Sequence, residues 1–222
     1  MTHRTLGLDD ALRVPAVRWL AVLVALETVS LVGYFGLTSA AIIDVRYVLY
    51  PFVWINVGVL AVLVTEPRDA SRRTQLLAAA GAVGYFLTLA YLSGLLGLEL
   101  GHAHAHVDGF QFTMSAPGYG PRLAYAGSLL TVTFIPYRVI GYLALAYLVY
   151  AAALDLSGAT LSGIVGLGSC IGCSLPLVTP VIAGIAGGTG LLSAATTFSI
   201  DLSTAVFVAA AVLLTLRPGG GG

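Results

Sequence analysis

Charged side chains are scarce in this chain of 222 residues. Only 9% of the residues are charged, and none of the ten basic residues is a lysine. A soluble domain carries about 25% charged residues, so the chain lacks the polar side chains that a water-facing surface requires. Hydrophobic residues make up 58% of the sequence, and the net charge is zero. The composition predicts a cell-membrane protein in contact with the lipid bilayer and gives no indication of a nucleic-acid partner.

Six segments are long and apolar enough to cross a bilayer, which takes roughly 20 residues. They cover residues 16–38, 47–65, 75–98, 123–154, 161–185 and 198–216. The fourth is long enough to contain a short interfacial piece before its span. The first has no typical cleavage site and is longer than a signal-peptide core, so we expect it to stay in the protein.

The predicted fold is therefore all-α, an integral membrane bundle of about six transmembrane helices in a multi-pass arrangement. Residues 1–218 are expected to form a single transmembrane domain, and residues 219–222 a flexible glycine tail.

The arginines are distributed unevenly about these spans. Seven lie on one predicted side, namely Arg4, Arg13, Arg18, Arg68, Arg72, Arg73 and Arg217, and three on the other, namely Arg46, Arg122 and Arg138. Because cytoplasmic loops carry the excess of basic residues, both termini are predicted to be cytoplasmic. The loop 66–74 is then also cytoplasmic, and the long loop 99–122 is external.

The chain has only two cysteines, Cys170 and Cys173, and both fall in the predicted fifth span. A CxxC spacing puts two sulfur atoms on one face of a helix. Pro176 and Pro180 follow, and each proline removes a hydrogen bond and clashes with the carbonyl four residues earlier. We expect the helix to be broken just beyond the cysteines, as in transporters that hold ions at broken helices.

Three uses of the cysteine pair are open. Cysteine is a small hydrophobic residue and can simply fill buried space. Two thiolates can bind a soft metal ion such as Cu(I). A dithiol can also close to a disulfide and exchange electrons with a partner.

The run CIGCSLPLVTP, residues 170–180, resembles the cysteine-containing first helix of bacterial mercury-uptake membrane proteins. It also resembles the cysteine–proline segments of membrane thiol-reductant conductors. Those conductors have cysteines on two helices, and the mercury proteins have the pair on the first helix, whereas here it lies on the fifth. The longer stretch 135–158, followed by GSCIGC, is similar to a group of uncharacterised haloarchaeal membrane proteins, a resemblance that implies no known activity.

Three histidines alternate with alanine in the external loop, at His102, His104 and His106. In an extended segment this spacing points all three imidazoles to one side. Imidazole suits copper and zinc, so the histidines are candidates to capture an ion and pass it to the cysteines. A short histidine tract in a polar loop can equally be solvated without a role.

Four polar residues are expected within or at the ends of spans: Glu27, Asn56, Arg138 and Asp201. An ionisable group in the bilayer costs about 2.5–3.5 kcal/mol, so Glu27 should face the bundle interior and have a partner. The four residues together can form a polar path beside the cysteines, with Arg138 acting on a thiol or pairing with Asp201. Alternatively, Asn56 joins two helices, while Arg138 and Asp201 extend to the outer interface.

These features predict a membrane protein that handles a soft metal ion, with copper favoured. Two alternatives remain: a membrane thiol–disulfide shuttle, and a non-catalytic accessory subunit that binds a membrane or extracellular protein partner. The sequence has no Walker motif, nucleophile elbow or zinc-protease motif, which favours a non-enzymatic role without deciding it.

Overall fold

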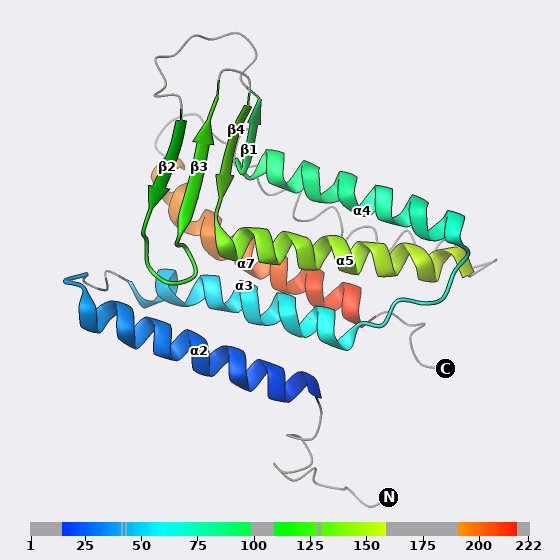
Figure 1. The fold of residues 1–222 in the computed structure, drawn as a ribbon, viewed down its shortest axis with the longest axis horizontal. Coiled ribbons are helices and arrows are strands. Elements are labelled where there is room, and N and C mark those ends of the chain that lie inside the picture. Colours follow the sequence, from blue (N-terminus) through cyan, green and yellow to red (C-terminus); the bar gives the residue numbers. More distant parts are fainter. Residues whose placement is uncertain are drawn as a thin grey trace, which may run out of the picture.

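The computed structural model describes residues 15–40, 42, 44–98, 109–127, 130–158 and 191–216. This part of the chain forms five helices and one small antiparallel sheet (Figure 1). The helices are α2 (Pro15–Leu37), α3 (Val45–Val64), α4 (Arg72–Leu92), α5 (Pro136–Gly158) and α7 (Leu191–Thr215). The strands are β1 (Leu96–Leu98), β2 (Gly109–Thr113), β3 (Arg122–Ala126) and β4 (Leu130–Phe134).

Four of these helices, α2, α3, α4 and α5, are long and apolar enough to cross a membrane. The fifth, α7, contains a shorter apolar stretch, Ile200–Thr215. A mostly helical protein with four such helices is compatible with membrane association, as predicted. The prediction of an all-α bundle with six spans is wrong for the described part of the chain, which holds five helices and a sheet. The predicted fifth span, residues 161–185, lies outside the described residues.

The helices lie side by side, and the sheet stands at one end of them with its strands crosswise to the helix axes (Figure 1). Successive helices α2, α3, α4 and α5 alternate in direction. Helix α7 runs in the same direction as α5, since both begin at the sheet end (Figure 1). The start of α2 and the end of α7 therefore lie at the end of the helices that is remote from the sheet.

Two helices begin at side-chain caps. The Asp44 carboxylate accepts the backbone N–H of Arg46 at 3.0 Å and caps α3. The Ser71 hydroxyl accepts the backbone N–H of Thr74 at 3.3 Å and caps α4. These bonds satisfy N–H groups that have no partner within the helix, and they fix where each helix starts.

Helix α5 is at the centre of the core and packs against α3, α4 and α7. Leu145, Leu148 and Leu154 of α5 are almost fully buried. On the neighbouring helices, the Trp54 ring of α3 stacks on Phe207 of α7, with ring centroids 4.1 Å apart and planes 7° from parallel. The edges of Tyr137 and Tyr142 of α5 complete this aromatic group.

Gly141 of α5 allows Trp54 to approach the helix backbone. A Cβ at this position would lie 2.5 Å from Cε3 of Trp54 and 3.2 Å from Cε2 of Phe207. Only glycine leaves room for the ring at this distance, so the stacked pair and Gly141 depend on each other.

The sheet is the main departure from the predicted fold. Its strand order is β1-β4-β3-β2, with every neighbouring pair antiparallel, so β1 and β2 are its two edges. Strand β1 was predicted as the end of the third span, and β3 and β4 as the start of the fourth. Their apolar residues merge with those of the helices into continuous hydrophobic runs, and a length criterion does not separate strand from helix in such runs. The period of two is visible in GFQFT and LTVTF, where apolar and polar residues alternate.

The hairpin between β2 and β3 rests on the helices. Gly118 in this hairpin has φ +88°, a conformation that favours glycine, and a Cβ there would lie 2.4 Å from Cβ of Pro51 in α3. The carbonyl of Gly118 accepts the backbone N–H of Tyr137, at the start of α5. The sheet is thus joined to the helices at β1, at the end of β4 and at this hairpin.

Candidate functional site

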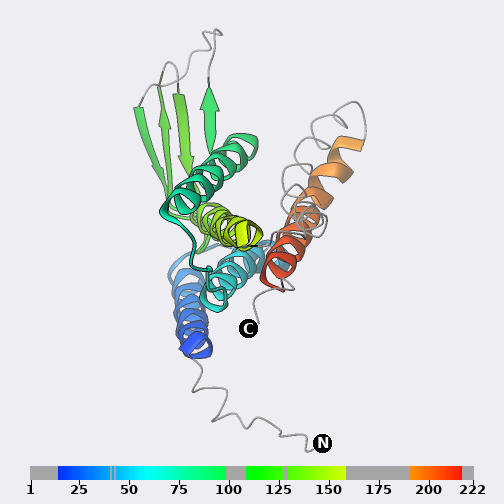
Figure 2. The same cartoon turned by 90° about the vertical axis from the view of Figure 1, so that its right-hand side faces the viewer.

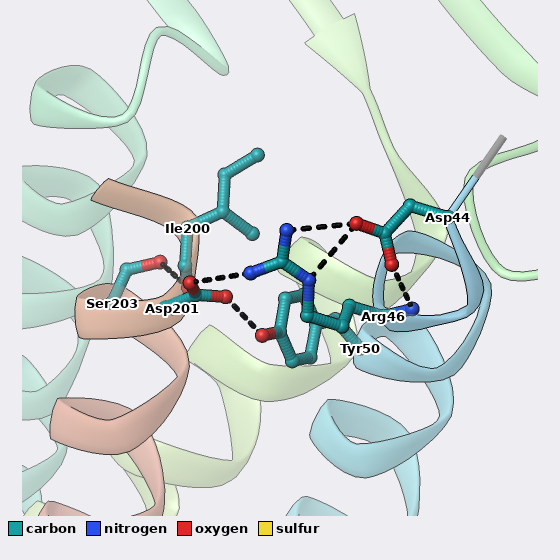
Figure 3. A network of polar contacts seen from close by, with 6 residues as sticks. All are labelled: Asp44, Arg46, Tyr50, Ile200, Asp201 and Ser203. Carbon is teal, nitrogen blue, oxygen red and sulfur yellow. Dashed lines mark hydrogen bonds and ion pairs between the residues drawn. The ribbon is translucent and has the colours of Figure 1, made fainter. Parts of the chain in front are cut away.

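A group of polar side chains connects α3 to α7 at the sheet end of the helices (Figure 3). Arg46 contacts Asp44 through Nη2 at 2.7 Å and Asp201 of α7 through Nη1 at 3.1 Å. The hydroxyl of Tyr50, one turn further along α3, donates to the other carboxylate oxygen of Asp201. We refer to Asp44, Arg46, Tyr50 and Asp201 as the α3–α7 polar cluster.

The cluster holds two carboxylates and one guanidinium, which leaves one formal negative charge in excess. The hydrogen bonds from the Arg46 side chain and backbone hold the pKa of Asp44 below its usual value, so this carboxylate stays ionised. The same end of the molecule also carries Arg122 of β3 and Arg138 of α5, so the cluster does not make this end anionic as a whole. Within the cluster itself, the guanidinium already occupies the position between the two carboxylates.

A second polar contact lies between α2 and α3. The amide nitrogen of Asn56 donates to Oε2 of Glu27 at 2.6 Å and to the backbone carbonyl of Phe52 at 2.8 Å. Glu27 is only 8% exposed, although it lies midway along a helix whose other side chains are mostly exposed. The remaining oxygens, Oε1 of Glu27 and Oδ1 of Asn56, are buried and have no hydrogen-bond partner within the described part of the chain. Such oxygens can accept a proton donor or a cation.

Arg138 makes its contacts at the junction between α5 and the end of α4. Its Nε donates to the Tyr137 hydroxyl at 3.0 Å, and its Nη1 donates to the backbone carbonyl of Ser93 at 3.1 Å. The Tyr137 ring also packs edge-on against Tyr119 of the β2–β3 hairpin, with centroids 5.1 Å apart. Burial and the neighbouring Tyr137 raise the pKa of Tyr119 to about 12, so Tyr119 stays neutral at physiological pH.

The four predicted polar residues therefore occupy three separate places. Glu27 and Asn56 are brought together, whereas Asp201 pairs with Arg46 and Arg138 contacts Tyr137 and Ser93. Sequence reasoning placed Arg46 only as an external charge, and it missed Asp44 and Tyr50. The sequence D-V-R directly before an apolar segment is the available signal, because aspartate is a preferred helix N-cap.

The predicted metal ligands Cys170, Cys173, His102, His104 and His106, and the predicted helix breakers Pro176 and Pro180, lie outside the described residues. Among the residues that the structure describes, no group of three or more His, Cys, Asp or Glu side chains is placed to hold a metal ion. A soft-metal site is therefore still a prediction from the sequence.

The apolar helices and the crosswise sheet define a helical protein of membrane-associated type with a small β-sheet at one end. The chain belongs to the family of unknown function DUF7546, whose model matches residues 2–221. No curated protein and no solved structure matches the chain. The resemblances to haloarchaeal, mercury-uptake and thiol-reductant proteins stay predictions.

Proposed function

We propose that this protein is a multi-pass membrane protein that binds a soft metal ion, with copper favoured, through Cys170 and Cys173. His102, His104 and His106 act as an external capture group that delivers the ion to the cysteines. The assignment follows ligand preference, because thiolates select soft ions and imidazole suits copper.

The direction of the helices supports one part of this proposal, a membrane crossing by the segment that contains the cysteines. Helix α5 ends at the end of the bundle remote from the sheet, and α7 begins at the sheet end (Figure 1). Residues 159–190 therefore connect opposite ends of the bundle, which supports a further crossing between the two helices. Roughly 20 residues suffice for a crossing, and the only two cysteines of the chain fall within this segment.

The three histidines of the capture group belong to the sheet end of the bundle, where α7 begins. Residues 99–108 join β1 to β2, and both strands belong to the sheet at which α7 also begins (Figure 1). In this proposal, a cation that arrives from the external side meets the histidines before it reaches the cysteine segment.

The test is elemental analysis of the purified full-length protein after growth with copper. We expect about one copper ion per wild-type chain, because two thiolates suffice for one Cu(I) ion. The C170S/C173S variant should contain almost none, and a control variant, S169A/S174A, should match the wild type. Equal copper content in the wild type and in C170S/C173S would overturn the proposal.

The exposed surface of α2 favours a second candidate, a non-catalytic accessory subunit. Helix α2 packs mainly against α3, and Ala16 and Glu27 are its only buried residues. Its remaining apolar faces are open to lipid or to another subunit. Purification in mild detergent should then retain a stoichiometric partner, and a lone monodisperse chain would count against this role.

A further inference from the structure

One face of the sheet is apolar and largely uncovered. In an antiparallel sheet, directly paired residues point to the same side, so the register puts Phe110 with Tyr125, and Phe112 with Leu123 and Phe134, on one face. Leu130 belongs to this face because it alternates with Val132 and Phe134 along β4. We call these six residues, Phe110, Phe112, Leu123, Tyr125, Leu130 and Phe134, the apolar sheet face. Their exposed fractions range from 40% to 82%.

The opposite face of the same strands is polar or small. It carries Gln111 and Thr113 of β2, Arg122 and Ala124 of β3, and Thr131 of β4. The sheet is therefore amphipathic, with no charged side chain on the apolar sheet face. Contiguous exposed apolar surface of this kind marks a contact with another molecule or with a membrane.

The position of the sheet selects the membrane as the occupant. The strands run crosswise to the helices, and the sheet extends beyond α4 to one side of the bundle (Figures 1 and 2). If the helices span the bilayer, the sheet lies at the bilayer surface, beside the lipids that surround α4. Aromatic side chains such as those of Phe110, Phe112 and Tyr125 are suited to this boundary region.

Exposed apolar side chains are also present on α4, the helix that leads directly into β1. Leu87 and Tyr91, in the last turns of α4, are exposed, and the chain passes directly from α4 into β1. Leu96 of β1 pairs with Val132 on the apolar side of the sheet and packs against the helical core. The apolar side of the sheet thus runs from Leu96 on the edge strand next to α4 to Phe110 on the far edge strand.

We propose that the apolar sheet face lies on the external surface of the lipid bilayer, with its aromatic side chains at the boundary between headgroups and acyl chains. This inference rests on the proposed membrane placement of the helices. It assigns to the sheet the role of an interfacial anchor.

The test uses nitroxide labels on single cysteines introduced into the C170S/C173S variant, which has no other cysteine. The full-length protein is reconstituted in vesicles of phosphatidylcholine and phosphatidylglycerol. Labels at F112C and T113C are compared, since these neighbours are both exposed but lie on opposite faces of β2. A label at L87C, on the outer surface of α4, reports the placement of the helix itself.

Collision rates with oxygen, which concentrates in lipid, and with a water-soluble nickel chelate distinguish the outcomes. We expect the ratio of oxygen to nickel collisions to be several-fold higher at 112 than at 113, and to approach the ratio at 87. Equal, water-like ratios at 112 and 113 would overturn the inference. Exclusion of both reagents at 112 alone would also overturn it, because protein, such as a second copy of the chain, would then cover the face.

The label at residue 87 distinguishes failure of the interfacial anchor from failure of the proposed membrane placement of the helices. A lipid-like ratio at 87 with a water-like ratio at 112 rejects the anchor and leaves the helices in the membrane. A water-like ratio at 87 rejects the membrane placement, and the anchor is rejected with it.

Discussion

Glu27 and Asn56 form a polar contact between two helices that are otherwise apolar where they meet. The bond from Asn56 to Oε2 of Glu27 is short, at 2.6 Å, and both side chains are largely withdrawn from solvent. Removal of one partner leaves the other buried without compensation, whereas removal of both leaves an apolar contact. The sequence predicted that Glu27 needs a partner, but not which residue, because nothing in a single sequence states how α2 is rotated about its axis.

Asn56→Leu should therefore destabilise the protein, by about 0.6–1.7 kcal/mol, which are the mean and the maximum found for hydrogen bonds between membrane helices. The double variant E27L/N56L should recover most of this loss, because the unpaired carboxyl group is gone. Denaturant unfolding of the purified protein in detergent measures both values. T28A is the control, since the Thr28 hydroxyl bonds only to the carbonyl of Val24 in its own helix. A double variant less stable than N56L would contradict this account.

At the scale of secondary-structure elements, the contact between α3, α5 and α7 depends on small residues at the crossing points. Gly141 leaves room for Trp54, and a Cβ at Gly58 of α3 would lie 3.1 Å from Cβ of Ala144 in α5. Close approach at small residues is how membrane helices gain packing contacts. These crossings hold the aromatic group of Trp54, Tyr137, Tyr142 and Phe207 together.

Gly141→Ala should destabilise this crossing by about 1–3 kcal/mol, the usual cost of an added methyl group in a filled core. Gly84→Ala in α4 is the matched control, because a Cβ at that position meets nothing within 4 Å. The control should be neutral or slightly stabilising, since alanine favours the helix over glycine by roughly 0.5–1 kcal/mol. Thermal unfolding in detergent measures the unfolding midpoint of both variants. Equal midpoints would contradict the prediction and show that the Trp54 ring accommodates the added methyl group.

The elements also show what the sequence could predict. Uninterrupted apolar segments located α2 and α3 to within two residues at each end. The fourth predicted span includes most of α5 but began thirteen residues too early, at 123 instead of Pro136. The strands within 123–134 were not predicted because their residues are about as hydrophobic as those of a transmembrane helix, and the prediction used hydrophobicity and length. The α3–α7 polar cluster escaped as well, since Arg46 and Asp201 are 155 residues apart and meet only in the folded chain.

At the scale of the whole molecule, the helix directions constrain how the protein sits in a membrane. The start of α2, the turn between α3 and α4, and the end of α7 share one end, and the sheet occupies the other (Figure 1). The end remote from the sheet carries the basic residues Arg68, Arg72 and Arg73, and basic residues favour the cytoplasmic side. Because the sheet end carries Arg46, Arg122 and Arg138, the preference comes from the whole sequence, with seven arginines against three, and on that count we expect the sheet to be external.

Labelling of intact cells with a membrane-impermeant maleimide tests this orientation. In the C170S/C173S variant, T113C on β2 should be labelled, and D69C between α3 and α4 should be labelled only after the cells are opened. Asp69 is a suitable site because acidic residues contribute little to orientation. The reverse pattern would invert the assignment of the two sides, and labelling of both sites in intact cells would reject the membrane orientation altogether.

The three joints between sheet and helices have a mechanical consequence. A sheet attached to the helices only at β1 and at the end of β4 could rotate about the line that joins these two attachments. The backbone of Gly118 against Pro51 of α3 supplies a third point, and the bond from the Tyr137 N–H to the Gly118 carbonyl reinforces the connection at the end of β4. Three contacts that are not on one line prevent the sheet from rotating relative to the helices. A displacement of the outer strands is therefore transmitted to the beginning of α3 and of α5.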